Sequence, residues 1–448
     1  MAELGVPCRG GKRRFNLAGT DLELVLTRDH QEICERLNAT GDFVLYFAPG
    51  GASFRSASMR CQMPPLIALS LALVFSSFII SGAQAGDCDA GEIHIGSDCA
   101  TVAEVADGIR RIVGEAIDSD HLKAVIVSVK IGDTPVLTEA WGESMTGVPA
   151  TTTMHFRNGA VAIAYLATVL LELQEKGQLS LDDKPSKWFP QYPEANQATL
   201  RMLISSTSGY ADYVDLKLLP LYANPFRQWT PDELIRLALD QPMKCAPGAC
   251  FAYSHANFVI LGEVLAKVTG KPVDALIKDG VLTPLRLENT RSEATPVIQE
   301  PVLHAFDGER GVYEDSTYWN PSWTLARGAV MTTDIGDLLT SAIAIGTGSL
   351  LSPQSHGLQT AMADPPLPGF SEDFYFGLGV VVIKSWIAQT PSFAGYAAAM
   401  AYLPPGKIGI AVTATIGPNT PDSPRPTDVL LAKLAGYLAP DHAPKLPR

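Results

Sequence analysis

The sequence has little charge, and less positive than negative charge. Only 18% of its 448 residues are charged, with 34 Lys and Arg against 47 Asp and Glu, so the net charge is −13. Proteins that wrap nucleic acid neutralise phosphates with a surplus of Lys and Arg, so nucleic acid is excluded as the main partner. The 46% of hydrophobic residues can bury a large core, which excludes intrinsic disorder as the main state of the chain.

Several common sequence signatures are missing. There is no repeat with a period of about 20–50 residues and no low-complexity tract, which excludes a solenoid. There is no G-x-x-x-x-G-K-[ST] phosphate loop, no G-x-S-x-G nucleophile elbow and no S-x-x-K pair. No two of the eight His are spaced for a metal site, and we expect no cofactor.

The apolar stretch over residues 66–80 is too short for a transmembrane helix, which needs roughly 20 residues. It follows Met59-Arg60 and precedes Ala83-Gln84-Ala85. A short basic start, an apolar stretch and an A-x-A site are typical of a secretory signal peptide, here residues 59–85. A buried internal helix is the alternative. A lipid anchor at Cys88 fits badly, because Asp87 directly precedes it.

A signal peptide preceded by 58 residues is unusual. We therefore expect Met59 to be the true start and residues 1–58 to be an extension outside the translated protein. The mature chain would begin at Gly86 with a net charge of −14. We expect it to be secreted or held in the periplasm or cell envelope, with no stable transmembrane anchor after cleavage. N-terminal sequencing of the secreted protein tests this, because retention of Arg13 and Arg14 would contradict it.

Cysteine usage favours an oxidising compartment. Three of the seven cysteines (Cys8, Cys34 and Cys61) lie in the part assigned to the extension and the signal peptide. The remaining four form two local pairs, Cys88 with Cys99 and Cys245 with Cys250, which predicts two disulfides. A metal or redox pair is the alternative for Cys245 and Cys250, but their spacing matches neither C-x-x-C nor a zinc knuckle.

Strand patterns at both ends of the mature chain enclose a helical middle. Strands are predicted over residues 124–131, 135–142, 377–386, 395–403 and 408–416. Helices are predicted over residues 101–118, 160–174, 199–205, 231–239, 257–269, 272–279, 333–345 and 427–438. We expect an α/β (α+β) fold in which both ends form one antiparallel sheet. A helical lobe lies beside it, with a site in the cleft between them.

Five sequence blocks, in order, carry a resemblance. They are FRNG at 156–159 with EKGQLSLDD at 175–183, LISSTSG at 203–209, the PG–FAYS–LG–VTGKP series at 247–272, ARG–MTTD at 326–334, and FGLG at 376–379. The chain resembles the penicillin-binding-type serine hydrolases: class C β-lactamases, serine D-Ala-D-Ala carboxypeptidases and related esterases. The resemblance implies a β-lactamase/penicillin-binding-protein-like fold for residues 102–440, after a short Cys-containing segment at residues 86–101.

The resemblance does not extend to the nucleophile. Acyl transfer in this family needs a Ser at the start of the central helix and a Lys one turn later. Aligning the FRNG block places that Ser at Ala160 and that Lys at Ile163, and neither side chain can attack a carbonyl or move a proton.

The other two motifs are also altered. The family's Tyr-x-Asn is Tyr253-Ser254-His255, which keeps the Tyr and loses the Asn. The family's Lys/His-Thr/Ser-Gly stretch on an edge strand holds the substrate carboxylate. It corresponds to Gln389-Thr390-Pro391-Ser392, which has no basic residue and a Pro in place of an N–H donor.

Some residues could still serve a site. Tyr253 is either a retained site residue or a core aromatic. His255 is a candidate base, because His titrates near neutral pH. Ser206, which stands where the family has a His, is a candidate displaced nucleophile on a loop (with Thr207 and Ser208) expected to face the cleft. The aromatic residues of a turn-rich segment either rim the cleft or pack the loop: Tyr313, Tyr318, Trp319 and Trp323.

Two functions follow. The favoured one is a secreted pseudoenzyme that recognises a cell-envelope peptide, a small acyl compound or a partner protein. The alternative is an active esterase, D-amino-acid peptidase or β-lactamase that uses a displaced nucleophile such as Ser206.

Overall fold

The computed structural model describes residues 11–17, 20–26, 88–89, 91–214, 223–292, 295–421 and 425–445. The chain divides into two compact units, Met1–Gln84 and Ala85–Arg448. In the first unit, β1 (Gly11–Leu17) and β2 (Thr20–Leu26) pair as antiparallel strands. The predicted signal peptide over 59–85 lies outside the described residues, as do Cys8, Cys34 and Cys61. The boundary of the units falls within the predicted cleavage site, and cleavage stays a prediction.

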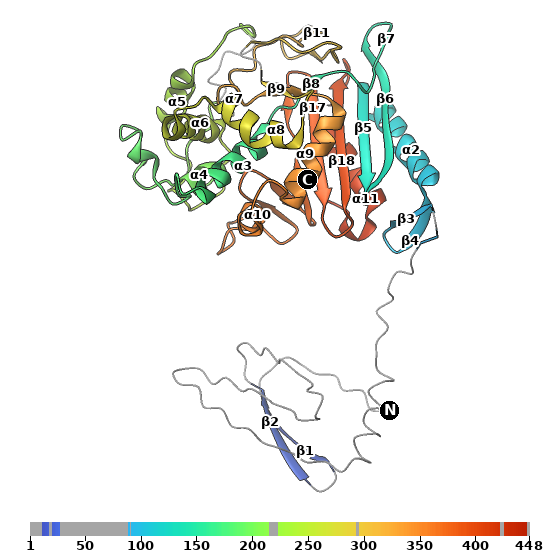
Figure 1. The fold of residues 1–448 in the computed structure, drawn as a ribbon, viewed down its shortest axis with the longest axis vertical. Coiled ribbons are helices and arrows are strands. Elements are labelled where there is room, and N and C mark those ends of the chain that lie inside the picture. Colours follow the sequence, from blue (N-terminus) through green and yellow to red (C-terminus); the bar gives the residue numbers. More distant parts are fainter. Residues whose placement is uncertain are drawn as a thin grey trace. The chain divides into compact units, whose positions relative to one another are not determined.

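The second unit is built on an antiparallel sheet drawn from both ends of its chain (Figure 1). The N-terminal strands are β5 (Leu122–Ile131), β6 (Thr134–Met145) and β7 (Val148–Pro149). The C-terminal strands are β13 (Phe374–Phe376), β14 (Val381–Ile383), β15 (Trp386–Gln389), β16 (Ser392–Phe393), β17 (Tyr396–Leu403) and β18 (Ile408–Ile416). Antiparallel pairing of β18 with β5 joins the two sets, which confirms the predicted sheet.

The sheet is covered on both faces, so its central strands are apolar on both sides. In β5, Val125 and Val127 pack into one hydrophobic cluster, and Ala124 and Ile126 pack into another. Successive strand residues point to opposite faces, and each face here meets helices rather than water.

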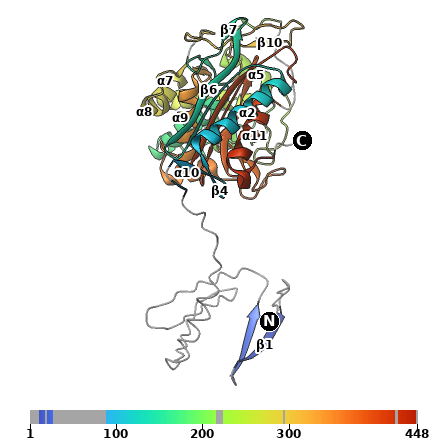
Figure 2. The ribbon, with the colours of Figure 1, turned by 90° about the vertical axis from the view of Figure 1, so that its right-hand side faces the viewer.

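Two helices cover the first face, as Figure 2 shows. They are α2 (Val102–Asp120) and α11 (Pro426–Leu438). Thr101 begins α2 with a capping box, in which its side chain accepts from the Glu104 N–H and the Glu104 side chain accepts from the Thr101 N–H. The buried residues of α2 recur every three to four positions, as expected for an amphipathic helix.

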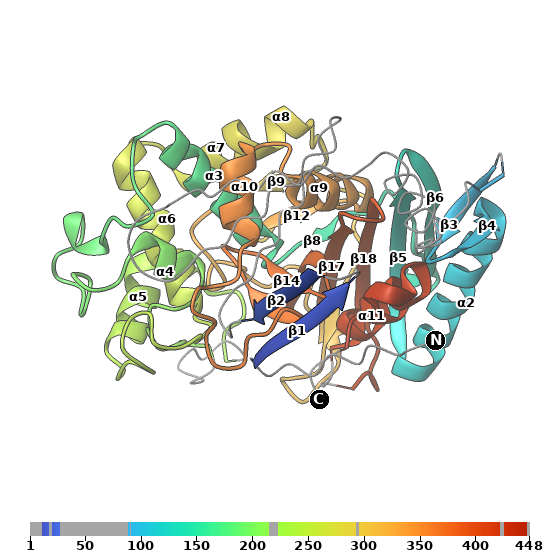
Figure 3. The ribbon, with the colours of Figure 1, turned by 90° about the horizontal axis from the view of Figure 1, so that it is seen from below.

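The second face meets α9 (Ile335–Thr347) and the helical lobe (Figure 3). The lobe contains α3 (Val161–Glu175), α4 (Leu200–Ile204), α5 (Pro231–Leu239), α6 (His255–Thr269), α7 (Val273–Ile277), α8 (Thr283–Leu285) and α10 (Pro353–Thr360). Twelve residues of α3 are buried, which fits its nearly all-apolar sequence.

Short strands complete the unit. β8 (Phe156–Arg157), β12 (Met331–Thr333) and β9 (Arg291–Ser292) form a small sheet next to α3. Two hairpins are made by β3 (Glu92–Ile95) with β4 (Asp98–Thr101) and by β10 (Phe306–Asp307) with β11 (Glu314–Asp315).

One predicted strand is wrong. The sequence predicts a single strand over residues 377–386, but this segment contains a turn, β14 and the first residue of β15. The Gly377 N–H donates to the Val380 carbonyl, and Gly379 has a φ of +71°, a backbone region that favours glycine. The two glycines therefore close a turn between β13 and β14.

The structure joins Cys88 to Cys99 and Cys245 to Cys250, the two pairs that the sequence predicts. Cys88, Cys99 and His94 together offer three possible metal ligands, but both sulfurs are used in the disulfide. Among the described residues, no helix has the length and apolar character needed to cross a membrane.

Candidate functional site

The start of α3 is fixed by a tight turn. Asn158 exchanges hydrogen bonds with β12, donating its N–H to the Met331 carbonyl at 3.1 Å, while its Oδ1 accepts from the Met331 N–H at 3.3 Å. Gly159 has a φ of +51°, and a Cβ at this position would lie 2.7 Å from Cβ of Pro391. Pro391 of the altered edge-strand motif therefore packs directly against the turn that begins α3.

The two residues that the sequence alignment assigns to the nucleophile and the lysine have apolar side chains. Ala160 is the N-cap of α3, half-buried and without a side-chain capping bond. Ile163, three residues later on the same face of the helix, is 1% exposed and packs against Gly379. Both positions therefore carry hydrocarbon side chains, and their assignment to nucleophile and lysine stays a prediction of the sequence alignment.

The segment that the sequence alignment assigns to Tyr-x-Asn ends in His255, which pairs with a buried carboxylate. His255, the first residue of α6, has Nδ1 at 2.9 Å and 3.1 Å from the two carboxylate oxygens of Asp212. Asp212 is 2% exposed, and its Oδ1 also accepts the Val214 N–H at 3.0 Å. Ser254 Oγ donates to the Ala211 carbonyl at 2.9 Å, which holds the Asp212 segment next to the start of α6.

Three aromatic rings surround His255. Tyr253 stands edge-on to it with ring centroids 5.2 Å apart, and the rings of Tyr213 and Trp323 lie at 5.9 Å and 6.1 Å. The Tyr213 hydroxyl donates to the Trp323 carbonyl at 2.8 Å, and burial raises its pKa well above the usual range, so it stays protonated.

The edge strand links these rings to the start of α3. Phe393 of β16 stacks on Trp323 with ring centroids 5.7 Å apart, and it lies two residues after Pro391. A contact chain therefore runs from Gly159 through Pro391, Phe393 and Trp323 to His255. We call the residues along it, with Ala160, Tyr253, Ser392 and Asp212, the candidate site.

The segment that the sequence alignment assigns to the third motif, residues 389–392, has no cationic side chain. Gln389 is buried and donates from Nε2 to the Gly379 carbonyl at 2.6 Å, and Ser392 is exposed. Thr390 Oγ1 accepts from Arg425 Nη2 at 3.4 Å, but that guanidinium is paired with Asp428 at 2.8 Å. A substrate carboxylate at this edge would therefore have to compete with Asp428 for Arg425.

A buried cation lies behind Phe393. The Arg157 guanidinium sits 5.5 Å from the Phe393 ring centroid, and its Nη2 donates to the Pro296 carbonyl at 2.6 Å. Burial lowers its pKa to about 10, and its Nε is buried without a hydrogen-bond partner among the described residues. The buried Arg157 therefore contacts the candidate site through the Phe393 ring.

The predicted Ser206 loop does not face an opening. Ser206 is fully buried with a φ of +54°, and its Oγ has no hydrogen-bond partner in the described chain. Its carbonyl accepts the Ala252 N–H at 2.9 Å, which ties the loop to the segment before Tyr253. Thr207 and Ser208 are buried as well, and Ser208 Oγ donates to Asn257 Oδ1 at 2.5 Å. The sequence predicts that this loop faces the cleft, whereas in the structure its three residues are buried in the lobe.

The four aromatic candidates do not lie at one common site. Trp323 belongs to the candidate site. Tyr313 stacks on Phe306 and donates to the Ile416 carbonyl, Tyr318 stands edge-on to His304, and Trp319 is buried. The sequence also missed Asp212, because it lies 43 residues from His255 and in no recognised motif.

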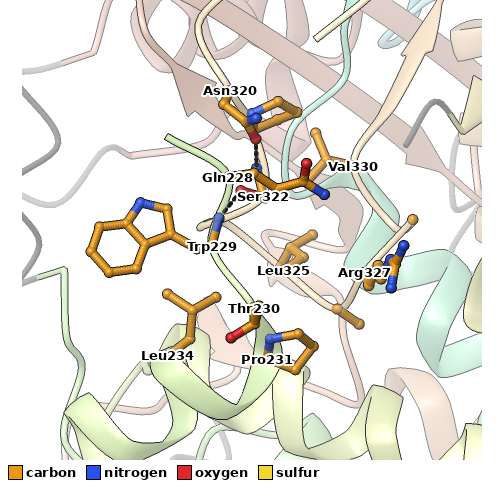
Figure 4. Close-up of a pocket in the computed structure, with 13 residues that line it drawn as sticks. Gln228, Trp229, Thr230, Pro231, Leu234, Asn320, Ser322, Leu325, Arg327 and Val330 are labelled. Atoms are coloured by element: carbon orange, nitrogen blue, oxygen red, sulfur yellow. Dashed lines mark hydrogen bonds between the residues drawn. The ribbon is translucent and has the colours of Figure 1, made fainter. Parts of the chain in front are cut away.

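The two cavities described below lie away from the residues of the candidate site. One of about 100 Å³ lies between the start of α5 and the 320–330 segment (Figure 4). At its edge the Trp229 N–H donates to Ser322 Oγ at 2.7 Å. Another hollow, of about 700 Å³, is lined by residues 274–292. Neither lining includes Ala160, Tyr253 or Ser392.

The comparisons with known proteins agree with this architecture. The Beta-lactamase family matches residues 109–434, more than half of the chain. The chain belongs to the β-lactamase family. Penicillin-binding protein PbpX of Bacillus subtilis (strain 168) is 31% identical over 129 residues, which is 29% of this chain and 30% of that protein. The chain spans less than half the length of the curated relatives it matches first.

Solved structures share the fold. A D-stereospecific amidohydrolase from a Streptomyces species has a TM-score of 0.64 at 23% identity, over 75% of this chain and 98% of that one. D-amino acid amidase from Ochrobactrum anthropi SV3, solved with D-phenylalanine, has a TM-score of 0.66 at 18% identity, over 75% and 99%. At these identities the similarity concerns the fold of this β-lactamase-family chain.

Proposed function

We propose that this β-lactamase-family protein is secreted, is a pseudoenzyme with respect to acyl-serine chemistry, and binds a ligand at the candidate site. One observation supports the proposal: Ala160 at the start of α3 and the buried Ile163 have apolar side chains, and the sequence alignment assigns these two residues to nucleophile and base. Loss of the nucleophile alone costs about a millionfold in turnover in a serine protease.

The ligand class follows from the surroundings of the site. Aromatic faces with a few polar groups bind small organic ligands. A cell-envelope peptide or a small acyl compound fits this chemistry, and structures with this fold include amidases of D-amino acids. The predicted signal peptide and the two disulfides support action outside the cytoplasm.

Active-site labelling tests the proposal. The mature chain is incubated with a fluorescent penicillin and with a fluorophosphonate, alongside a chromogenic lactam. We expect no covalent label and no lactam turnover. Labelling that disappears in Ser206→Ala but persists in Ser392→Ala would overturn the proposal in favour of the displaced nucleophile. The complete burial of Ser206 argues against that outcome.

A further inference from the structure

The candidate site retains one complete acid–base pair, although it lacks the serine machinery. Both oxygens of Asp212 lie within hydrogen-bond distance of His255 Nδ1, and the Val214 N–H holds the carboxylate in place. In the part of the chain that the structure describes, no Lys or Arg forms an ion pair with Asp212. The carboxylate is therefore directed at the imidazole.

This pairing sets the tautomer of His255. A carboxylate only accepts, so the proton between the two groups resides on Nδ1, and Nε2 of the neutral ring carries the lone pair. Tyr253, Tyr213 and Trp323 contact the ring and limit its rotation. The His255 side chain is 19% exposed, whereas the Asp212 side chain is 2% exposed, so solvent contacts part of the imidazole side chain but hardly any of the carboxylate.

We propose that Asp212 and His255 activate a water molecule that hydrolyses an ester at this site without an acyl-enzyme intermediate. His255 Nε2 takes a proton from water as the water oxygen bonds to the carbonyl carbon. The bond from that carbon to the leaving oxygen then breaks, and the leaving oxygen takes the proton from Nε2. An acid and an alcohol are released, and His255 returns to its neutral form.

In this proposal His255 is the base and Asp212 is a positioning residue. Ester hydrolysis goes beyond the ligand binding proposed above. It rests on the proposed function only because both use the candidate site. If the ester-hydrolysis proposal fails, the proposed absence of acyl-serine chemistry still stands, because that proposal depends on Ala160 and Ile163.

A second His–Asp pair provides a matched control. His304 Nδ1 lies 2.7 Å from Asp315 Oδ2, and Tyr318 stands edge-on to the His304 ring at 6.0 Å. The His304 side chain is about as exposed as that of His255, but the Asp315 side chain is 39% exposed, and none of the aromatic contacts of His304 involves Trp323. Background ester cleavage by an accessible imidazole should be equal for both His residues.

The experiment measures hydrolysis of p-nitrophenyl acetate by the mature chain and by His255→Asn, His255→Ala, Asp212→Asn and His304→Ala. Circular dichroism establishes that each variant is folded. Since a general base contributes about 100-fold or more, we expect His255→Asn to lower kcat about 100-fold, with a smaller change in KM. Asp212→Asn should also lower kcat, His304→Ala should not, and added imidazole should restore activity to His255→Ala.

The proposal is overturned if the wild-type rate equals that of His255→Asn, if both His variants lose the same activity, or if imidazole restores nothing. Covalent acetyl-protein found by intact mass during turnover would overturn it as well. That last outcome would also overturn the proposed function, whereas the first three would not, so the two failures are distinguishable.

Discussion

At the scale of single residues, two positions decide what the site can do. Ala160 and Ile163, which the sequence alignment assigns to nucleophile and lysine, have apolar side chains, and Ile163 is part of the packing against Gly379. Both assignments rest on the sequence alone, because these residues fall in a block whose neighbours are easily aligned. It did not predict Asp212, because the His–Asp pair forms only when the chain folds.

Restoring the family's residues should not restore its chemistry. In the double variant Ala160→Ser with Ile163→Lys, the new Lys replaces a side chain that is buried against Gly379, and the third motif still lacks a cation. Burying an unpaired ammonium is costly, so we expect a loss of stability of several kcal/mol. Urea unfolding and lactam hydrolysis measure the two effects. Strong activity in this variant would show that the edge-strand alignment is wrong.

Gly159 should be less replaceable than a glycine in open space. Gly159→Ala combines a strained φ with a contact to Pro391, whereas Gly132 has a similar φ of +56° and nothing within 4 Å of the point where a Cβ would lie. We expect about 1 kcal/mol of destabilisation for Gly132→Ala from backbone strain alone. Gly159→Ala should cost clearly more in urea unfolding. Equal losses would mean that Pro391 does not pack tightly against the start of α3.

At the scale of elements, long periodic segments were predictable and turns were not. The helices α2, α3 and α11 lie close to their predicted bounds, because their apolar patterns extend over several turns. The predicted strand over residues 377–386 failed because Gly377 and Gly379 close a turn inside an apolar run. The burial of the loop at Ser206 was not predictable either, because its polar sequence resembles that of a solvent-exposed loop.

The disulfide between Cys245 and Cys250 should support the lobe side of the site. Its loop donates backbone hydrogen bonds from Lys244 and Gly248 to the Gly209 and Thr207 carbonyls. Replacing both cysteines by Ser should lower stability by about 2 kcal/mol in the chain-entropy account, and should weaken ligand binding. The matched replacement of Cys88 and Cys99 acts on a hairpin outside the site. It should leave binding unchanged, as measured by calorimetry, and weaker binding there would contradict this assignment.

At the scale of the whole molecule, the sheet built from both chain ends brings distant segments together. β5 pairs with β18, and β16 brings Pro391 and Phe393 to the start of α3 and to Trp323. The predicted architecture was therefore confirmed, because it depends on the order of strand-forming and helix-forming segments. The contacts within the site were not predictable, because they depend on side-chain packing between segments far apart in the sequence.

The central claim is that this β-lactamase-family fold binds a ligand without forming an acyl-enzyme. Mass spectrometry of the mature chain with a penicillin or a D-amino acid amide tests it, by comparing native with denaturing conditions. The account predicts a ligand-bound mass under native conditions and the unmodified mass after denaturation. An adduct that survives denaturation, or no bound ligand under either condition, would contradict the account.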